Sequence, residues 1–333
     1  MAVEMQQQFF ELLKNSLPPN VSLVDELVER LGLSYDSVYR RIRGEKPLNM
    51  GEIKDLCKHY RISLDQVMDL SSDAIVFHAP GINVEHLPFL DYLKGMLQQV
   101  SYFNSFKSKH IRYLCKDMIF FHFFLYPEMS AFKTFFWVKT IQNNKAYSKK
   151  LFSLRDKDFE ECYKIGQLII KQYNEVPSVE LWNAESINST LSQIEYYLES
   201  KMFASNEDFL QVIESFERTL DHLEDQASKG FKFMPGDSPS QYKAPLQFYI
   251  NEVVLGNNTI LADLDGTKHS FITYNVLNYM VTKDPRFATR AFTSFDTLVS
   301  RSTLISSTGE KERSRFFFRY KERIAALKKH SAS

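Results

Sequence analysis

Apolar positions in the first seventy residues recur every three or four residues, the spacing of one face of an α-helix. One such segment runs from Ser22 to Gly32, and its closing glycine tolerates the positive φ of a helix C-cap. The next runs from Ser34 to Gly44. The pattern predicts two helices that are joined by a short turn.

Three further helices complete this region in the prediction. One covers about residues 4–15 and ends ahead of a Pro-Pro pair, which cannot continue a helix. The pairs Asn49–Glu52 and Ser63–Gln66 are capping boxes, in which two side chains satisfy backbone donors at a helix start. We therefore expect a compact five-helix bundle over residues 1–70.

The pattern between residues 85 and about 229 is also helical, after a segment at residues 71–84 that is typical of a linker. Several apolar or aromatic positions per turn predict helices at 87–102, 110–125, 127–141, 156–173, 186–200 and 206–226.

The pattern changes after Gly230, where segments rich in β-branched and aromatic residues follow one another. Asp265-Gly266 separates two of them, and Asp-Gly between apolar runs is a strong signal for a type I′ hairpin. We expect a small antiparallel three-stranded meander near residues 246–275. Its predicted strands are 246–255, 259–264 and 268–274, and helices are predicted near 275–283, 286–304 and 309–329.

The fold class predicted from these patterns is mainly α. It combines the N-terminal five-helix bundle with a larger helical domain over residues 85–333, which carries the β meander. The 28 Phe and 17 Tyr residues are concentrated after residue 85, so this larger domain can build an aromatic-rich core.

Composition excludes several classes of protein. Residues 118–138 form the most apolar stretch, but His122, Pro127, Glu128 and Lys133 interrupt it, so it does not predict a membrane span. The first residues lack the layout of a signal peptide, and the three cysteines lie far apart. The sequence therefore predicts a reduced, cytoplasmic protein. The histidines have no metal-ligand spacing, so neither a metal nor a cofactor is predicted.

The specific functional signal lies in LVDELVERLGLSYDSVYRRIRGEK, residues 23–46, which resembles the helix-turn-helix of the phage-repressor and Cro-like (XRE-like) family. LCKHYRISLDQV, residues 56–67, resembles the closing helices of that family. The resemblance covers about residues 5–70. The chain departs from the family pattern at Ile42, where an acidic residue is frequent, and at Arg41, where an apolar residue is common.

The resemblance implies that residues 35–43 form a recognition helix. The N-terminal side chains of such a helix contact base edges in the major groove, while basic residues bind phosphates. The implied base-contact candidates are Tyr35, Asp36, Ser37 and Arg40, and the implied phosphate-contact candidates are Arg41, Arg43, Lys46 and Lys54.

An alternative without DNA stays open. Residues 1–70 hold nine Lys and Arg against eleven Asp and Glu, so the domain as a whole is slightly acidic. The arginines could then form a solvated helix end that complements the helix dipole, within a protein-interaction scaffold. The acidic residues lie mostly in other helices, however, which leaves a local basic face and favours DNA binding.

One motif points to an enzyme instead. ILADLDGT, residues 260–267, resembles the first motif of the haloacid-dehalogenase phosphatases, which would make Asp263 a nucleophile and Asp265 a general acid/base beside Mg²⁺. The residues that follow show no alternating strands and helices, and the residues ahead are predicted to be helical, which leaves no source of parallel strands. A hairpin turn explains Asp265-Gly266 with fewer assumptions than an active site does, so the sequence predicts no enzyme.

The resulting prediction is a transcriptional regulator that binds double-stranded DNA in a sequence-specific manner as a homodimer. Its C-terminal domain would dimerise or sense a signal, and a peptide or small-molecule effector stays open because the layout resembles that of peptide-sensing regulators. The last helix, near residues 309–329, is basic and carries an apolar stripe. It fits a surface helix that packs by one face better than a further phosphate-binding surface.

Overall fold

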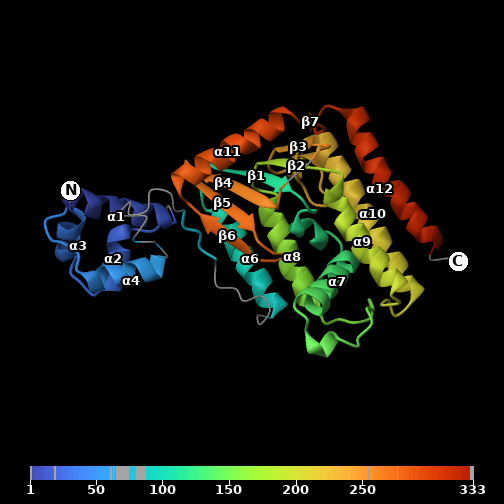
Figure 1. Ribbon diagram of the computed structural model, residues 1–333, viewed down its shortest axis with the longest axis horizontal. Helices are drawn as coiled ribbons and strands as arrows, with labels where there is room; N and C mark the ends of the chain where they lie inside the picture. The colour runs from blue at the N-terminus through green and yellow to red at the C-terminus, as the bar shows by residue number, and fades with distance from the viewer. Residues whose placement is uncertain are drawn as a thin grey trace. The chain divides into compact units, whose positions relative to one another are not determined.

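The chain forms two compact units in the computed structural model (Figure 1). The first holds residues 1–78 and 282–287, and the second holds residues 79–281 and 288–333. The predicted domain borders at residues 70 and 85 stay predictions. The residues that the structure describes are 2–18, 20–60, 62, 64, 75–79, 88–253, 256–275 and 277–330.

The N-terminal unit contains four described helices at positions that the sequence predicts. They are α1 (Ala2–Ser16), α2 (Leu23–Leu31), α3 (Tyr35–Ile42) and α4 (Met50–Tyr60). The predicted fifth helix, which begins with the Ser63–Gln66 capping box, and most of the predicted linker at residues 71–84 lie outside the described residues. The buried core of the unit consists of Phe9, Phe10, Leu13, Leu27, Val38 and Leu56.

Local sequence explains the turn between α2 and α3. Gly32 adopts φ 63°, the left-handed conformation that ends a helix and that a residue with a Cβ adopts at a cost. The Ser34 side chain then accepts a hydrogen bond from the backbone N–H of Ser37 and caps the start of α3. Two short helices in contact across a three-residue turn make a helix-turn-helix.

The C-terminal unit is built on a seven-stranded mixed sheet with the order β6-β5-β4-β1-β2-β3-β7. Neighbours β1, β2 and β3 are parallel, whereas β4 is antiparallel to both β1 and β5, and β7 is antiparallel to β3. The strands are β1 (Lys109–Cys115), β2 (Ser178–Trp182), β3 (Leu246–Ile250), β4 (Thr259–Leu264), β5 (Thr267–Thr273), β6 (Tyr279–Thr282) and β7 (Thr303–Leu304).

Helices cover both faces of this sheet (Figure 1). Phe292 and Phe295 of one helix pack on Val179 and Leu181 of β2 and on Leu261 of β4, which forms a small separate core. All the other long helices share the large aromatic core on the opposite face. The helix that carries Phe292 and Phe295 is α11 (Pro285–Ser300). The other long helices are α6 (Phe89–Asn104), α7 (Pro127–Phe136), α8 (Glu160–Tyr173), α9 (Glu185–Glu199), α10 (Asn206–Lys229) and α12 (Glu310–His330).

Short helical turns connect these elements. They are the 3₁₀ turns Phe120–Phe124, Lys145–Tyr147 and Pro239–Gln241, and the π-helical turn Trp137–Ile141 that continues α7.

The predicted three-stranded antiparallel meander is wrong. Strand β3 does not pair with β4, because β1 and β2 lie between them and β3 is parallel to β2. The predicted helix at 110–125 begins as β1, and the predicted helix at 275–283 contains β6. Only the hairpin of β4 and β5 is confirmed. Its turn residues Asp265 and Gly266 have φ 48° and 85°, as a type I′ turn requires. Helices nevertheless make up most of the chain.

The apolar stripe predicted for the last helix is confirmed in α12. Three of its basic residues pair with acidic residues of α10 and α9, so part of the positive charge of the helix is neutralised within the unit. These pairs are Lys321 with Asp221 and Glu224, Arg323 with Glu195, and Lys328 with Glu217. The buried stripe consists of Phe316, Phe317, Tyr320, Ile324 and Leu327.

Among the described residues, no helix has both the length and the apolar character that crossing a bilayer requires.

Candidate nucleic-acid interface

One face of α3 is exposed and carries both aromatic and basic side chains. Tyr35 and Tyr39 are 54% and 47% exposed, although large aromatic residues are normally buried. Asp36, Arg40 and Arg43 are exposed as well. Spacings of three and four residues place these side chains along one side of the helix. The opposite side of α3 is anchored in the core by Val38.

Tyr39 was missed as a candidate by sequence reasoning. It lies four residues after Tyr35 and three after Asp36, so helical spacing alone would have grouped it with them. An exposed aromatic residue on the face that carries Arg40 can contribute apolar contact to a thymine methyl group or to the sugar backbone.

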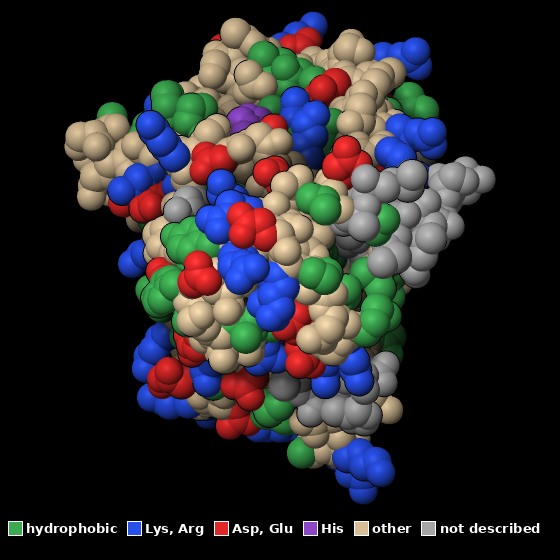
Figure 2. All heavy atoms as spheres, turned by 90° about the vertical axis from the view of Figure 1, so that its left-hand side faces the viewer, with side chains coloured by type: hydrophobic (Ala, Val, Ile, Leu, Met, Phe, Trp, Pro, Cys, Tyr) green, Lys and Arg blue, Asp and Glu red, His purple; other side chains and the backbone are tan. Residues whose placement is uncertain are grey.

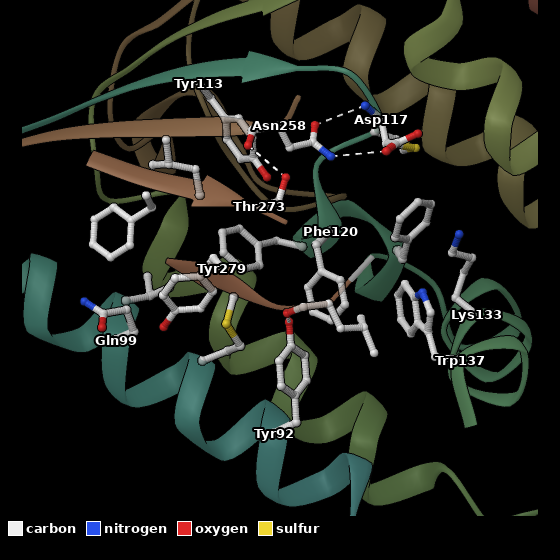
Figure 3. Close-up of a pocket in the computed structure, with 18 of the residues that line it drawn as sticks. Tyr92, Gln99, Tyr113, Asp117, Phe120, Lys133, Trp137, Asn258, Thr273 and Tyr279 are labelled. Carbon is white, nitrogen blue, oxygen red and sulfur yellow. Dashed lines mark hydrogen bonds between the residues drawn. The ribbon is translucent and has the colours of Figure 1, made fainter. Parts of the chain in front are cut away.

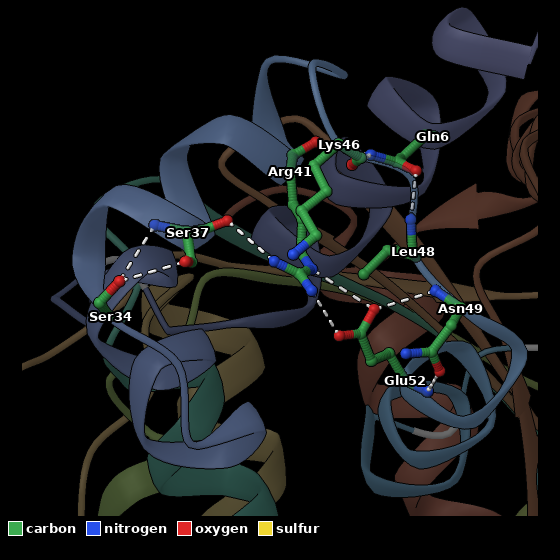
Figure 4. Close-up of polar contacts among 8 residues, drawn as sticks. All are labelled: Gln6, Ser34, Ser37, Arg41, Lys46, Leu48, Asn49 and Glu52. Carbon is green, nitrogen blue, oxygen red and sulfur yellow. Dashed lines mark hydrogen bonds and ion pairs between the residues drawn. The ribbon is translucent and has the colours of Figure 1, made fainter.

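Arg41 lies on the other side of α3 and is only 4% exposed (Figure 4). Its Nη2 and Nε donate to the two carboxylate oxygens of Glu52 on α4, at 2.7 and 3.4 Å, and its Nη1 donates to the Ser37 carbonyl at 3.2 Å. Burial by itself would raise the pKa of Glu52, but the hydrogen bonds from Arg41 and from the Asn49 backbone outweigh it and lower that pKa. Arg41 thus binds helix α3 to α4.

This geometry explains how an arginine can occupy position 41. The position faces the protein, where an apolar residue is common, and here Glu52 supplies the counter-charge that a buried guanidinium requires. Among the predicted phosphate contacts, Arg41 is therefore the one whose side chain already has a structural role.

The segment that follows α3 is attached to α1 by Gln6 (Figure 4). The amide of Gln6 donates to the carbonyls of Arg41 and Lys46 at 2.7 and 2.9 Å, and its oxygen accepts from the Leu48 N–H at 2.8 Å. Backbone groups held in this way make the loop that carries Lys46 part of the rigid unit.

The remaining candidates differ in how they are held. The Tyr35 hydroxyl donates to Asp25 on α2 at 2.9 Å, and this hydrogen bond raises the pKa of Tyr35. Ser37 is half-buried and belongs to the cap, since the Ser34 hydroxyl donates to it at 3.1 Å. Lys46 in the loop and Lys54 on α4 are both exposed.

Glu45 lies beside the exposed Arg40 and Arg43 and forms ion pairs with both of them. Its carboxylate is 2.6 Å from the Arg43 Nε and 3.6 Å from the Arg40 Nε, and the hydrogen bond from Arg43 lowers the pKa of Glu45. All three side chains are about half exposed, so these pairs are weak and exchangeable. A phosphate group that approached Arg43 would replace the Glu45 carboxylate.

Charge is mixed over the wider surface. Across the face shown in Figure 2, Lys and Arg side chains alternate with Asp and Glu and form no continuous basic field, in keeping with a formal net charge of zero. On this face, an attraction to nucleic acid would therefore come from the local arrangement on and after α3.

A two-helix motif with an exposed, arginine-bearing second helix has the form of a DNA-binding domain. The family model described as the BetR domain matches residues 8–91, about a quarter of the chain, from within α1 to the first turn of α6. The N-terminal domain is thus of a DNA-binding type that is associated with transcriptional regulators. The resemblance to the phage-repressor and Cro-like family in particular stays a prediction. No curated protein and no solved structure matches the chain.

The second candidate site, around Asp263, has a different geometry from that expected of a phosphatase. Parallel strands do exist, so the expectation that the sheet lacks them is wrong. Asp263 nevertheless lies on β4, which is antiparallel to β1, so β4 ends at the sheet edge where β1–β3 begin. Asp263 accepts from the Gly266 N–H at 3.0 Å, and Asp265 accepts from the Ser108 N–H at 2.7 Å. Both carboxylates therefore stabilise the turn.

Proposed function

We propose that this chain is a sequence-specific transcriptional regulator whose N-terminal unit places α3 in the major groove of double-stranded DNA. The observation that carries the proposal is the exposed face of α3. Arg40 can donate two hydrogen bonds to a guanine, and Asp36 can accept from a cytosine amino group. Tyr35 and Tyr39 flank them with apolar surface. The BetR domain match supports this assignment.

Phosphate contacts are assigned to Arg43 and Lys46, with Lys54 as a further candidate, because these side chains are exposed. Such contacts position the protein on the duplex without distinguishing sequence. Arg41 is left out of this set, since its guanidinium is paired with Glu52.

The regulator is proposed to act as a homodimer, because a single domain of this size offers few base contacts. Two copies would bind half-sites one helical turn apart, about 34–36 Å, on a palindromic sequence. The C-terminal unit would supply the dimer contact or respond to a signal, and no catalytic function is proposed for it.

Replacing Arg40 with alanine is expected to weaken binding to the preferred DNA sequence by roughly 5- to 150-fold, which corresponds to the about 1–3 kcal/mol of a bidentate base contact. Binding to random duplex should change much less. Selection of a preferred sequence with the purified chain, followed by fluorescence anisotropy at fixed salt, measures both values.

The matched control for Arg40 is Arg301→Ala, an exposed arginine of the C-terminal unit, which should leave both affinities unchanged. If selection yields no preferred sequence at moderate salt, or if Arg40→Ala and Arg43→Ala bind like the original chain, the N-terminal unit is an interaction scaffold rather than a DNA reader.

Replacing Glu45 with glutamine is expected to raise the affinity for any duplex by roughly two- to fivefold at low salt. The change removes a carboxylate that competes with phosphate for Arg43 and Arg40, and ion pairs between such exposed groups are weak and screened by salt. Anisotropy titrations across a salt series measure this effect, with the exposed Glu199→Gln on α9 as the control. An unchanged or lower affinity would place DNA away from these arginines.

A further inference from the structure

The C-terminal unit contains a cavity of about 250 Å³ beneath the β4–β5–β6 side of the sheet (Figure 3). Side chains from α6, from the segment after β1, from α7 and from α9 close it from the other sides. Its walls are mainly aromatic, and they include Tyr92, Tyr113, Phe120, Phe121, Trp137 and Tyr279. Ligand sites in proteins are typically concave, mainly apolar and supplied with a few polar groups.

Lys133 of α7 is the basic group of this cavity and is 3% exposed. Figure 3 shows it beside Trp137 at one end of the cavity, with Gln99 at the other end. Its Nζ donates to the Gln193 side-chain oxygen at 2.7 Å and lies 4.1 Å from the centre of the Phe123 ring. Within the described part of the chain, no carboxylate comes within 4.0 Å of it.

An ammonium group has three N–H donors, and a neutral amide oxygen satisfies only one of them here. Burial lowers the pKa of Lys133 to about 7, and the charge of Asp117 offsets this only in part. A buried cation without a counter-ion is costly, so an anionic group of a ligand would stabilise the charged form of Lys133.

Thr190 of α9 is a second polar group of the same cavity. Its side chain is fully buried, and its hydroxyl has no hydrogen-bond partner among the described residues. Thr190 lies three residues before Gln193, so both side chains point from the same face of α9. The Thr190 hydroxyl and the Lys133 ammonium group thus line the same cavity, each with donors that lack a hydrogen-bond partner among the described residues.

Asp117 limits the charge that a ligand can carry. Its carboxylate accepts from the Asn258 side chain at 3.2 Å, and its N–H donates to the Asn258 oxygen at 3.1 Å (Figure 3). Because this pair is already satisfied and negatively charged, it would repel a second anionic group. One negative charge per ligand is therefore the best fit. The volume, below the about 300–1,000 Å³ of drug-sized sites, favours a small molecule over a peptide.

We propose that this cavity binds a small monocarboxylate with an apolar or aromatic body, whose carboxylate accepts hydrogen bonds from Lys133 Nζ and the Thr190 hydroxyl. The aromatic walls would enclose the rest of the ligand. This inference deepens the proposed signal-sensing role of the C-terminal unit, although binding in the cavity does not require that the chain bind DNA.

The test is calorimetry on the full chain without DNA, with phenylacetate, indole-3-acetate and octanoate, each against its neutral amide. At least one acid should bind at least tenfold more tightly than its amide. Lys133→Met keeps the length and apolar stem of the side chain and should abolish that preference, whereas Thr190→Val should weaken binding of the acid several-fold.

Lys139→Met is the control, because the Nζ of Lys139 donates to the Lys150 carbonyl and the residue does not line the cavity. Thermal unfolding verifies that each variant is folded. The proposal is overturned if none of the three acids binds, if acids and amides bind equally, or if a folded Lys133→Met keeps the preference. Loss of DNA binding with intact acid binding would instead reject only the proposed DNA function.

Discussion

Replacing Arg41 with alanine is expected to destabilise the N-terminal unit by about 3–5 kcal/mol, the usual cost of removing one partner of a buried ion pair. The Glu52 side chain is only 14% exposed and would keep its charge without the guanidinium that balances it. The change also removes the hydrogen bond from Arg41 to the Ser37 carbonyl within α3. A loss of this size is a large share of the about 5–15 kcal/mol that stabilises a domain.

Amide hydrogen exchange of the full chain measures this effect, because it reports α1–α4 separately from the C-terminal unit. Arg41→Ala should raise exchange throughout α3 and α4. The double change Arg41→Met and Glu52→Met should restore most of the protection, since apolar residues of similar volume can replace a buried ion pair. Unchanged exchange in α3 of Arg41→Ala would show that the pair contributes nothing to stability.

Lowering the pH from 7 to 5 is expected to destabilise the C-terminal unit by about 2 kcal/mol through His122 alone. His122 is 1% exposed, and burial lowers its pKa from 6.5 to about 3, helped by the nearby charges of His222 and Lys232. Between these two values the unfolded chain binds a proton that the folded chain excludes. Stability therefore falls as the pH drops below about 6.5, and this loss is complete near pH 3.

Urea unfolding at pH 7 and pH 5, followed by tryptophan fluorescence, measures this difference, because Trp137 and Trp182 both lie in the C-terminal unit. His122→Phe should reduce the loss of stability by about 2 kcal/mol. At pH 7 the free energy of unfolding of His122→Phe should equal or exceed that of the original chain. The reason is that both ring nitrogens of His122 are buried without a partner among the described residues. Burial also lowers the pKa of His222, so only the difference between the two chains is assigned to His122. An equal loss of stability between pH 7 and pH 5 in His122→Phe and in the original chain would contradict the assignment to His122.

Local chemistry made part of this fold predictable from sequence. The start of α3 follows from the Ser34 cap, and the end of α2 follows from Gly32, because both depend on residues within one helical turn. The β4–β5 hairpin was predictable for the same reason, since Asp265-Gly266 adopts the positive φ values that its turn requires. The inward side of α3, with Val38, was predictable from helical spacing, whereas Arg40 and Asp36 were assigned to the exposed side through the resemblance to repressor domains.

The sheet was not predictable in this way. Residues 110–115 alternate half-buried and buried side chains. The apolar stretch that begins at Met118 made the predicted helix start as early as residue 110. Strand β2 is buried on both faces and shows no alternation at all. Both strands depend on partners that lie far along the chain, such as β1 with residues 259–264, and no local pattern records that pairing.

The sequence by itself determined the helix-turn-helix, its capped and glycine-ended helices and the type I′ hairpin, because each depends on backbone preferences of neighbouring residues. Only the tertiary structure decided that Arg41 is paired with Glu52 rather than free for a phosphate, and that Lys133 and Thr190 line one cavity. Burial and counter-charge are properties of groups brought together from distant positions, and spacing along the chain does not contain them.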